Sequence, residues 1–287
     1  MAGSNTTLRL ALTQKKPPIL CNERSMKNTH SNNWPAIDLE VWSEFKLVNL
    51  DNEYGSLLNK HVPEHDLVFP RADQNLHGIT INGLDDIKRI IAWNDLLMRP
   101  TLDIAKSAFA HIEGDAISHA YTPVDKSTIA KVEGPNRKVF VDHVITLQAD
   151  PWRNLVVGLG KPSSRFNMGG IHSANARISE HGYVLRHLAH LCTSANTPYG
   201  YIQTDRELVA CQFKRNGDRY KVYYMQIQWS THGPERLTTD LALWWLCMKA
   251  LSPAVLQIED ITPHPNDPTI WMDEFLGNPG EPSVPYY

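Results

Sequence analysis

The chain has 287 residues, of which 42% are hydrophobic and 21% are charged, a composition typical of a globular protein with a sizeable core. Its 28 lysines and arginines stand against 31 aspartates and glutamates, giving a formal net charge of −3. The chain therefore lacks the basic excess typical of proteins that grip a phosphate backbone, and this disfavours nucleic acid as the main partner.

The spacing of the cysteines and the length of the hydrophobic runs indicate the cellular compartment of the protein. The four cysteines are widely separated and form no pattern of zinc ligands, which is typical of buried thiols in a reducing compartment. No run approaches the length of a membrane-spanning helix, and Leu8 to Leu12 is too short for a signal peptide. We expect an intracellular protein, cytoplasmic or nuclear, with no membrane partner. No nucleotide or hydrolase motif is present, so no cofactor is expected.

The ends of the chain differ in composition from its middle. Residues 1–35 are polar and mixed, which predicts a flexible or loosely docked arm. Residues 261–287 are rich in proline, which predicts an extended tail laid over the surface. The intervening residues 36–260 predict a single domain.

Within that domain, helices and strands follow one another. The first helix is predicted to begin at Asn82 as its N-cap; Pro100 should end or kink it, and helical character continues from Thr101 to Ile112. Further helices are predicted from Ser173 to Ala195 and from Thr238 or Thr239 onward, the last being apolar all round and so buried. Strands are predicted at residues 127–132, 139–147, 155–157, 199–214 (a hairpin) and 220–229. This order predicts one α/β domain with a mixed central sheet flanked by helices.

Asp142 and Lys161 are charged residues that belong to two otherwise apolar runs, and strand formation does not require a charge at either position. Asp142 stands inside Val-Phe-Val-Asp-His-Val-Ile, where a carboxylate is costly unless something satisfies it. It is either a structural carboxylate bonded to a loop N–H or an arginine, or a ligand of a hard cation such as Mg²⁺. A metal-dependent phosphodiesterase would also need a second carboxylate nearby and a lysine, a role open to Lys161.

The order of these segments resembles a large fungal family of PD-(D/E)XK nuclease-like domains. The helix Ile90 to Ala105, the strand with Asp142 and the run Asn154 to Phe166 follow the family's order. The segments TDRELV (204–209) and LALWWL (241–246) are the most specific pieces. The likeness covers roughly residues 75–260. It implies a restriction-endonuclease-like fold in which Asp142 takes the place of the first metal-binding acid.

The sequence departs from the family's pattern where metal would bind. The family's acid-x-lysine step is here Leu159-Gly160-Lys161, so the lysine is kept and the acid is a leucine. Val141 replaces the family's proline, and Ile90-Ile91 stand where its helix often has a glutamate. A lone carboxylate holds Mg²⁺ weakly. We therefore expect that nuclease activity has been lost and that no metal is bound.

Further polar residues lie near the predicted site. Asp205 and Glu207 fit the family's pattern and would approach from the hairpin. The simpler interpretation is a turn residue that bonds its own backbone and an exposed partner for Arg206. The loop from Lys161 to Gly170, with Arg165, either cradles an anion or is an ordinary connection.

The leading hypothesis is a degenerate nuclease-like protein whose cleft binds or converts a small molecule, as auxiliary enzymes of fungal secondary-metabolite pathways do. One alternative is a non-catalytic module that binds nucleic acid or protein. Another is a residual Mg²⁺-dependent nuclease in which Asp205 or Glu207 supplies the missing acid. The sequence leaves open whether the protein is an enzyme.

Overall fold

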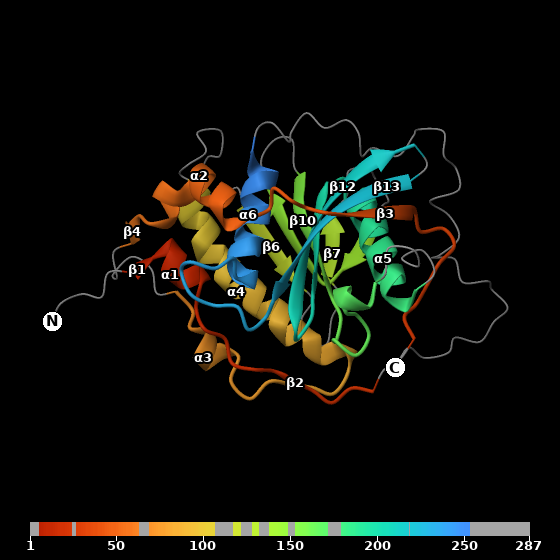
Figure 1. The fold of residues 1–287 in the computed structure, drawn as a ribbon, viewed down its shortest axis with the longest axis horizontal. Helices are drawn as coiled ribbons and strands as arrows, with labels where there is room; N and C mark the ends of the chain where they lie inside the picture. Colours follow the sequence, from red (N-terminus) through yellow and green to blue (C-terminus); the bar gives the residue numbers. More distant parts are fainter. Residues whose placement is uncertain are drawn as a thin grey trace.

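The computed structural model describes residues 6–24, 27–62, 69–106, 117–121, 128–131, 138–148, 153–171, 179–217 and 219–252. Their centre is a mixed sheet (Figure 1) with the strand order β3 (Ala36–Val41), β13 (Arg219–Gln228), β12 (Glu207–Asn216), β11 (Tyr199–Gln203), β10 (Arg153–Gly160), β9 (His143–Leu147) and β6 (Ile117–Tyr121). The pairs β3–β13 and β10–β11 are parallel, and the other neighbours are antiparallel. The predicted hairpin is β11 and β12, and the predicted strand after it is β13.

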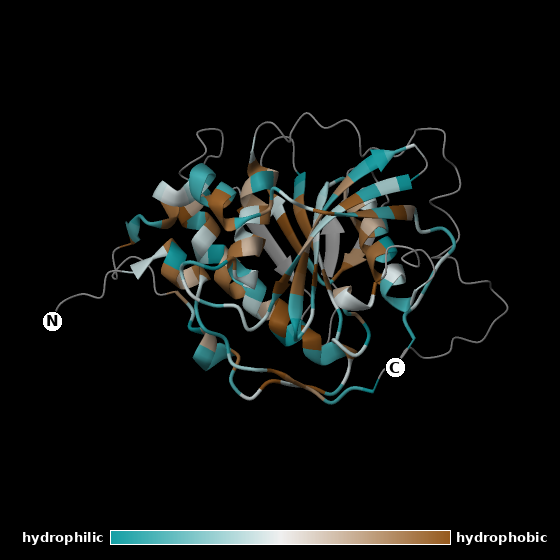
Figure 2. Cartoon of the chain, in the orientation of Figure 1, coloured by the Kyte–Doolittle hydropathy of each residue, from teal (hydrophilic) through white to brown (hydrophobic). Residues whose placement is uncertain are grey.

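Helices cover both faces of this sheet (Figure 1). One face carries α1 (Leu8–Leu12), α2 (Leu47–Leu58), α4 (Lys88–Ala105) and α6 (Thr239–Leu251), and the other carries α5 (Glu180–Ser194). Each face has its own cluster of buried apolar side chains, because neighbouring strand residues point to opposite faces. Tyr201 of β11 belongs to the cluster with α6, whereas Ile202 belongs to the cluster with α5. Figure 2 shows the apolar residues gathered on the sheet and on the helix sides that face it. The predicted α/β class is confirmed.

Helix α6 confirms the prediction of a helix buried on every side. Thr238 is its N-cap, and the Thr238 hydroxyl accepts the N–H of Leu241 at 3.1 Å. Trp244 and Trp245 are fully buried, since the helix lies between the sheet and the helices α1 and α4. A helix without a polar face is stable only in such a place.

The start of the first predicted helix needs a correction. Asn82 is not the N-cap of this helix. A short 3-10 helix, η1 (Leu84–Ile87), precedes α4, and Gly83 is the N-cap of η1. Asp86 instead accepts the backbone N–H of Asn82 at 2.9 Å. Pro100 lies inside α4, so the helical character predicted beyond it is confirmed as far as Ala105.

The predicted strand 139–147 is two strands that separate at Asp142. β8 (Lys138–Val141) pairs with β7 (Thr128–Lys131) in a hairpin of its own, and β9 joins the central sheet. The three predicted strands at 127–132, 139–147 and 155–157 therefore pair in chain order but in two sheets, because the chain bends at Asp142 and leaves one sheet for the other.

The N-terminal residues 6–24 and 27–34 are part of the folded unit, so the prediction of a flexible arm is wrong for its described part. Leu8 and Leu12 are fully buried, and Lys16 forms an ion pair with Asp240. β2 (Leu20–Cys21) pairs with β5 (Thr80–Ile81). Apolar contacts and a buried charge hold this segment in spite of its polar composition.

Short elements complete the described part: β1 (Thr6–Thr7), β4 (His61–Val62), α3 (Ala72–Asn75) and the 3-10 helix η3 (Met168–Gly170). None of the described helices is long and apolar enough to cross a membrane. The predicted tail 261–287 and the first residues of the helix predicted from Ser173 lie outside the described residues.

Candidate functional site

The parallel strands β10 and β11 bring the predicted site residues to one end of the sheet. Gly160 pairs with Gln203, and the backbone N–H of Lys161 donates to the carbonyl of Gln203 at 2.9 Å. The loop 161–170 and the turn 204–206 therefore leave the sheet side by side. Asp142 joins them, because its Oδ2 accepts the N–H of Gly160 at 2.9 Å. In α/β folds, ligands commonly bind at the carboxyl ends of parallel strands.

Asp142 and Lys161 lie within electrostatic reach of each other in a partly dry environment. Burial raises the pKa of Asp142, while the Gly160 N–H and the cations Lys161 and Lys88 oppose that rise. Burial lowers the pKa of Lys161, and the attraction of Asp142 opposes that fall. The two shifts bring the proton affinities of the pair closer together, as is typical of groups placed for proton transfer.

The position of the family's second acid is apolar in structure as well as in sequence. Leu159 is 4% exposed and belongs to the apolar cluster on the α5 face, together with Val157 and Phe166. Within the described residues, no group of three or more histidine, cysteine, aspartate or glutamate side chains is placed to hold a metal ion. Leu159 therefore offers Asp142 no carboxylate with which to share a Mg²⁺ ion, as the acid at this position in the family would.

Asp205 lies in the predicted turn, but its carboxylate does not bond to its own backbone, and Glu207 is buried and not exposed. Asp205 accepts the N–H and the hydroxyl of Ser163, both at 2.7 Å. Glu207 accepts the N–H of Met168 at 2.7 Å and a bond from the Gln226 amide. Both carboxylates thus hold the 161–170 loop against the hairpin, and neither hydrogen-bonds to Asp142.

The turn itself is held by a different residue, Thr204. Its hydroxyl accepts the N–H of Arg206 at 3.0 Å and of Glu207 at 2.9 Å. Because Thr204 supplies the local bonds that the sequence suggested for Asp205, the Asp205 carboxylate is left to reach across to the loop.

Arg165 is bound by a carboxylate that the sequence did not reveal, that of Glu23. Arg165 donates to Glu23 Oε1 from Nε at 2.9 Å and from Nη2 at 2.6 Å, and the Ser164 hydroxyl donates to Oε2 at 2.7 Å. Asn28 adds a bond from its side-chain amide to the Arg165 carbonyl at 2.8 Å. In this structure the 161–170 loop thus bonds to three of the protein's own carboxylates, those of Glu23, Asp205 and Glu207.

A buried polar network lies on the other side of Asp142, toward α4. His143 Nδ1 is 2.6 Å from the hydroxyl of Tyr201, and His143 Nε2 is 3.5 Å from Oδ1 of Asp95. Asn94 donates to Tyr201 and to Gln203 at 3.4 and 3.2 Å. All five residues are buried, and burial raises the pKa of Tyr201 well above its usual range. The polar pair Asn94-Asp95 within an apolar helix was the sequence signal for this network.

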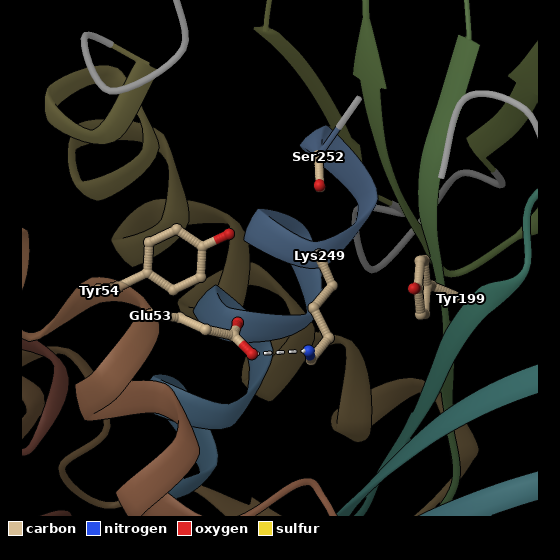
Figure 3. Close-up of a pocket in the computed structure, with 5 residues that line it drawn as sticks. All are labelled: Glu53, Tyr54, Tyr199, Lys249 and Ser252. Atoms are coloured by element: carbon tan, nitrogen blue, oxygen red, sulfur yellow. Dashed lines mark hydrogen bonds and ion pairs between the residues drawn. The ribbon is translucent and has the colours of Figure 1, made fainter. Parts of the chain in front are cut away.

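An open pocket of about 390 Å³ lies at the opposite end of β11 (Figure 3). Glu53, Tyr54, Tyr199, Lys249 and Ser252 line it, and Lys249 donates to Glu53 at 3.4 Å. Burial raises the pKa of both tyrosines to about 12, so they remain neutral phenols. Because Tyr199 begins β11 and Gln203 ends it, this pocket is separate from Asp142 and Lys161.

No family model, curated protein or solved structure matches this chain. The likeness to nuclease-like domains therefore stays a prediction from the residues.

Proposed function

We propose that this protein is a nuclease-like α/β protein without metal-dependent nuclease activity, and that it binds a small anionic molecule at the sheet end formed by Asp142, Lys161 and Arg165. A helix followed by a mixed sheet, with Asp142 beside the strand that leads to Lys161, supports the proposal. So does the likeness of the segments that carry these residues. A place in a fungal secondary-metabolite pathway remains a prediction.

Leu159 is the observation that carries the loss of nuclease activity. A hydrolytic Mg²⁺ site needs carboxylates placed to share the ion, and the side chain at this position is an alkyl group packed in the core. Asp205 and Glu207 do not replace it, because the backbone N–H groups of the loop already take up their oxygens. This weighs against the residual nuclease of the sequence analysis.

The proposed chemistry rests on the Lys161 cation and the Asp142 carboxyl, which lie within electrostatic reach of each other. The ammonium of Lys161 would attract an anionic group, and burial makes it a stronger proton donor than an exposed lysine. Asp142, with its raised pKa, would accept or return a proton on the bound molecule. The two groups would thus serve both the binding and the acid–base conversion of the same ligand.

A nucleic-acid-binding role has less support. Arg165 pairs with Glu23 and Lys88 pairs with Asp85, so these neighbours of Lys161 do not form the row of unpaired cations that contacts with successive phosphates require.

Calorimetry with MgCl₂ and MnCl₂ on the wild type and Asp142→Ala, alongside a nuclease assay on plasmid DNA, tests the proposed function. We expect no saturable metal binding and no cleavage by either protein. Metal binding by the wild type that disappears in Asp142→Ala, together with cleavage, would reject the proposal and restore the nuclease.

A further inference from the structure

We propose that the Glu23 carboxylate occupies a subsite for a carboxylate group of the ligand, and that the ligand's own carboxylate takes its place when it binds. The subsite consists of the Arg165 guanidinium and the Ser164 hydroxyl. The inference rests on the proposed function for its location beside Lys161, and it adds the chemical class of the ligand.

The geometry around Glu23 is that of a bound carboxylate. One oxygen receives two N–H groups of Arg165, at 2.9 and 2.6 Å, and the other receives the Ser164 hydroxyl at 2.7 Å. The side chain of Glu23 is 6% exposed, and that of Arg165 is 15% exposed. Charge-assisted bonds from arginine to a shielded carboxylate are strong and directional. A ligand carboxylate would meet the same donors in the same plane.

Glu23 differs from the other two carboxylates that bond to the 161–170 loop in how it is held. Asp205 and Glu207 belong to the β11–β12 hairpin and are fixed by the central sheet. Glu23 follows β2, a strand of two residues, and its backbone N–H and that of Asn22 both donate to the Ile81 carbonyl. A segment with so few backbone bonds opens at a lower free energy than the sheet does. Glu23 is therefore the carboxylate that a ligand would displace.

The donors of this subsite match a carboxylate better than a phosphate. With Glu23 displaced, the N–H groups of Arg165 and the hydroxyl of Ser164 that hold its two oxygens would bind the two oxygens of one ligand carboxylate. Arg165 and Glu23 both affect the pKa of Lys161, so the subsite lies within electrostatic reach of that lysine. A phosphate would bring a third oxygen that these two groups do not match.

The Glu23→Ala variant tests the subsite with acetate as the probe, because acetate restores the atoms that the substitution removes. We expect acetate, titrated at constant ionic strength with chloride, to raise the melting temperature of Glu23→Ala in a saturable manner. Its apparent affinity should exceed that for the wild type at least about tenfold, since the tethered carboxylate no longer competes. The effect should disappear in Glu23→Ala/Arg165→Gln.

An equal response of wild type and Glu23→Ala, a response kept in the double variant, or none in folded Glu23→Ala would overturn the inference. If Glu23→Ala does not fold, Glu23→Gln replaces it, because glutamine keeps the size of the side chain and loses its charge. Acetate should then speed tryptic cleavage after Arg24 and Lys27 at about tenfold lower concentration than in the wild type. Equal concentration dependence would reject the subsite.

The two proposals fail separately. Metal binding does not involve Glu23, so failure of the acetate experiment with no metal bound rejects the subsite alone. Asp142-dependent metal binding by the wild type rejects the proposed function whatever acetate does.

Discussion

Lys16 with Asp240 and Lys161 with Asp142 are the same chemical pair in different surroundings. The Lys16 and Asp240 side chains are 0% and 2% exposed, with Nζ 2.9 Å from Oδ1. Lys16 also contacts the Thr239 hydroxyl and lies 4.2 Å from the centroid of the Trp229 ring. Lys161 and Asp142 instead lie where β10 ends, partly exposed and next to a loop.

The difference separates a structural role from a chemical one. The Lys16–Asp240 pair fastens the N-terminal segment to the first turn of α6, and every neighbour that surrounds it is part of the core. The Lys161–Asp142 pair fastens nothing of comparable size, yet burial shifts the pKa of both groups. A costly pair that contributes little to packing is a candidate for function.

Breaking the enclosed pair should have the largest effect. Lys16→Met leaves the Asp240 carboxylate buried without its cation, and we expect it to lower the free energy of unfolding by about 3–5 kcal/mol. Urea denaturation at pH 7 measures the change. The control Lys16→Met/Asp240→Asn, which removes both charges, should recover much of the loss. A loss below about 1 kcal/mol in the single variant would contradict the structural role.

The loss of stability in acid should show how far water is excluded from the region around Lys161, because His187 of α5 lies within electrostatic reach of that lysine. Burial lowers the pKa of His187 to about 3, with Lys161 adding to the effect, whereas an unfolded histidine titrates near 6.5. The unfolded chain therefore binds a proton below about pH 6.5 that the folded chain refuses, so stability falls from that pH toward pH 3. His187→Phe keeps the stacking on Trp34 and removes this titration.

Urea denaturation at pH 6.5 and at pH 4 measures how much free energy of unfolding each protein loses between these two pH values. The loss in His187→Phe should be smaller than that in the wild type by about 1–2 kcal/mol, a figure reduced for the partial exposure of the ring. Equal losses of free energy of unfolding in the two proteins would mean that His187 is solvated and that water reaches this region.

Asp142→Asn should have the smallest effect, opposite in sign to that of Lys16→Met. Asparagine can still accept the Gly160 N–H and does not ionise. Since burial raises the folded pKa above 3.8, the charged form of Asp142 costs the folded state free energy that appears as the pH rises through and above that value.

We therefore expect Asp142→Asn to be more stable than the wild type by up to about 1 kcal/mol at pH 7 and equal to it near pH 3. Denaturation at both pH values measures this. Asp240→Asn is the matched control, and it should be less stable at pH 7. A destabilised Asp142→Asn would make Asp142 a structural carboxylate.

The sequence predicted correctly the helices and strands whose residue pattern lies within a few neighbouring positions. The apolar run of α6, the hairpin with its turn at Thr204 to Arg206, and the strand β13 all follow from spacing within a few residues. The break at Asp142 was missed because a continuous apolar run does not show where a chain changes sheets.

Because only local patterns can be recognised in the sequence, only part of the candidate site could be predicted. Asp142 and Lys161 stand out within their own runs, and the structure places them together. Glu23 did not stand out, because its partner Arg165 is 142 residues away in the chain. The bonds of Asp205 to Ser163 and of Glu207 to Met168 could not be predicted either, since they span 42 and 39 residues. Contacts of this range depend on the whole fold.

Mn²⁺ binding by Leu159→Asp, measured by calorimetry, tests most directly the claim that an alkyl side chain at this position has removed metal chemistry. We expect no binding by the wild type, binding of about one ion per chain by Leu159→Asp, and none by Leu159→Asp/Asp142→Asn. Leu159→Asn controls for the polar group placed in the core. Binding by the wild type, or none by a folded Leu159→Asp, would contradict the claim.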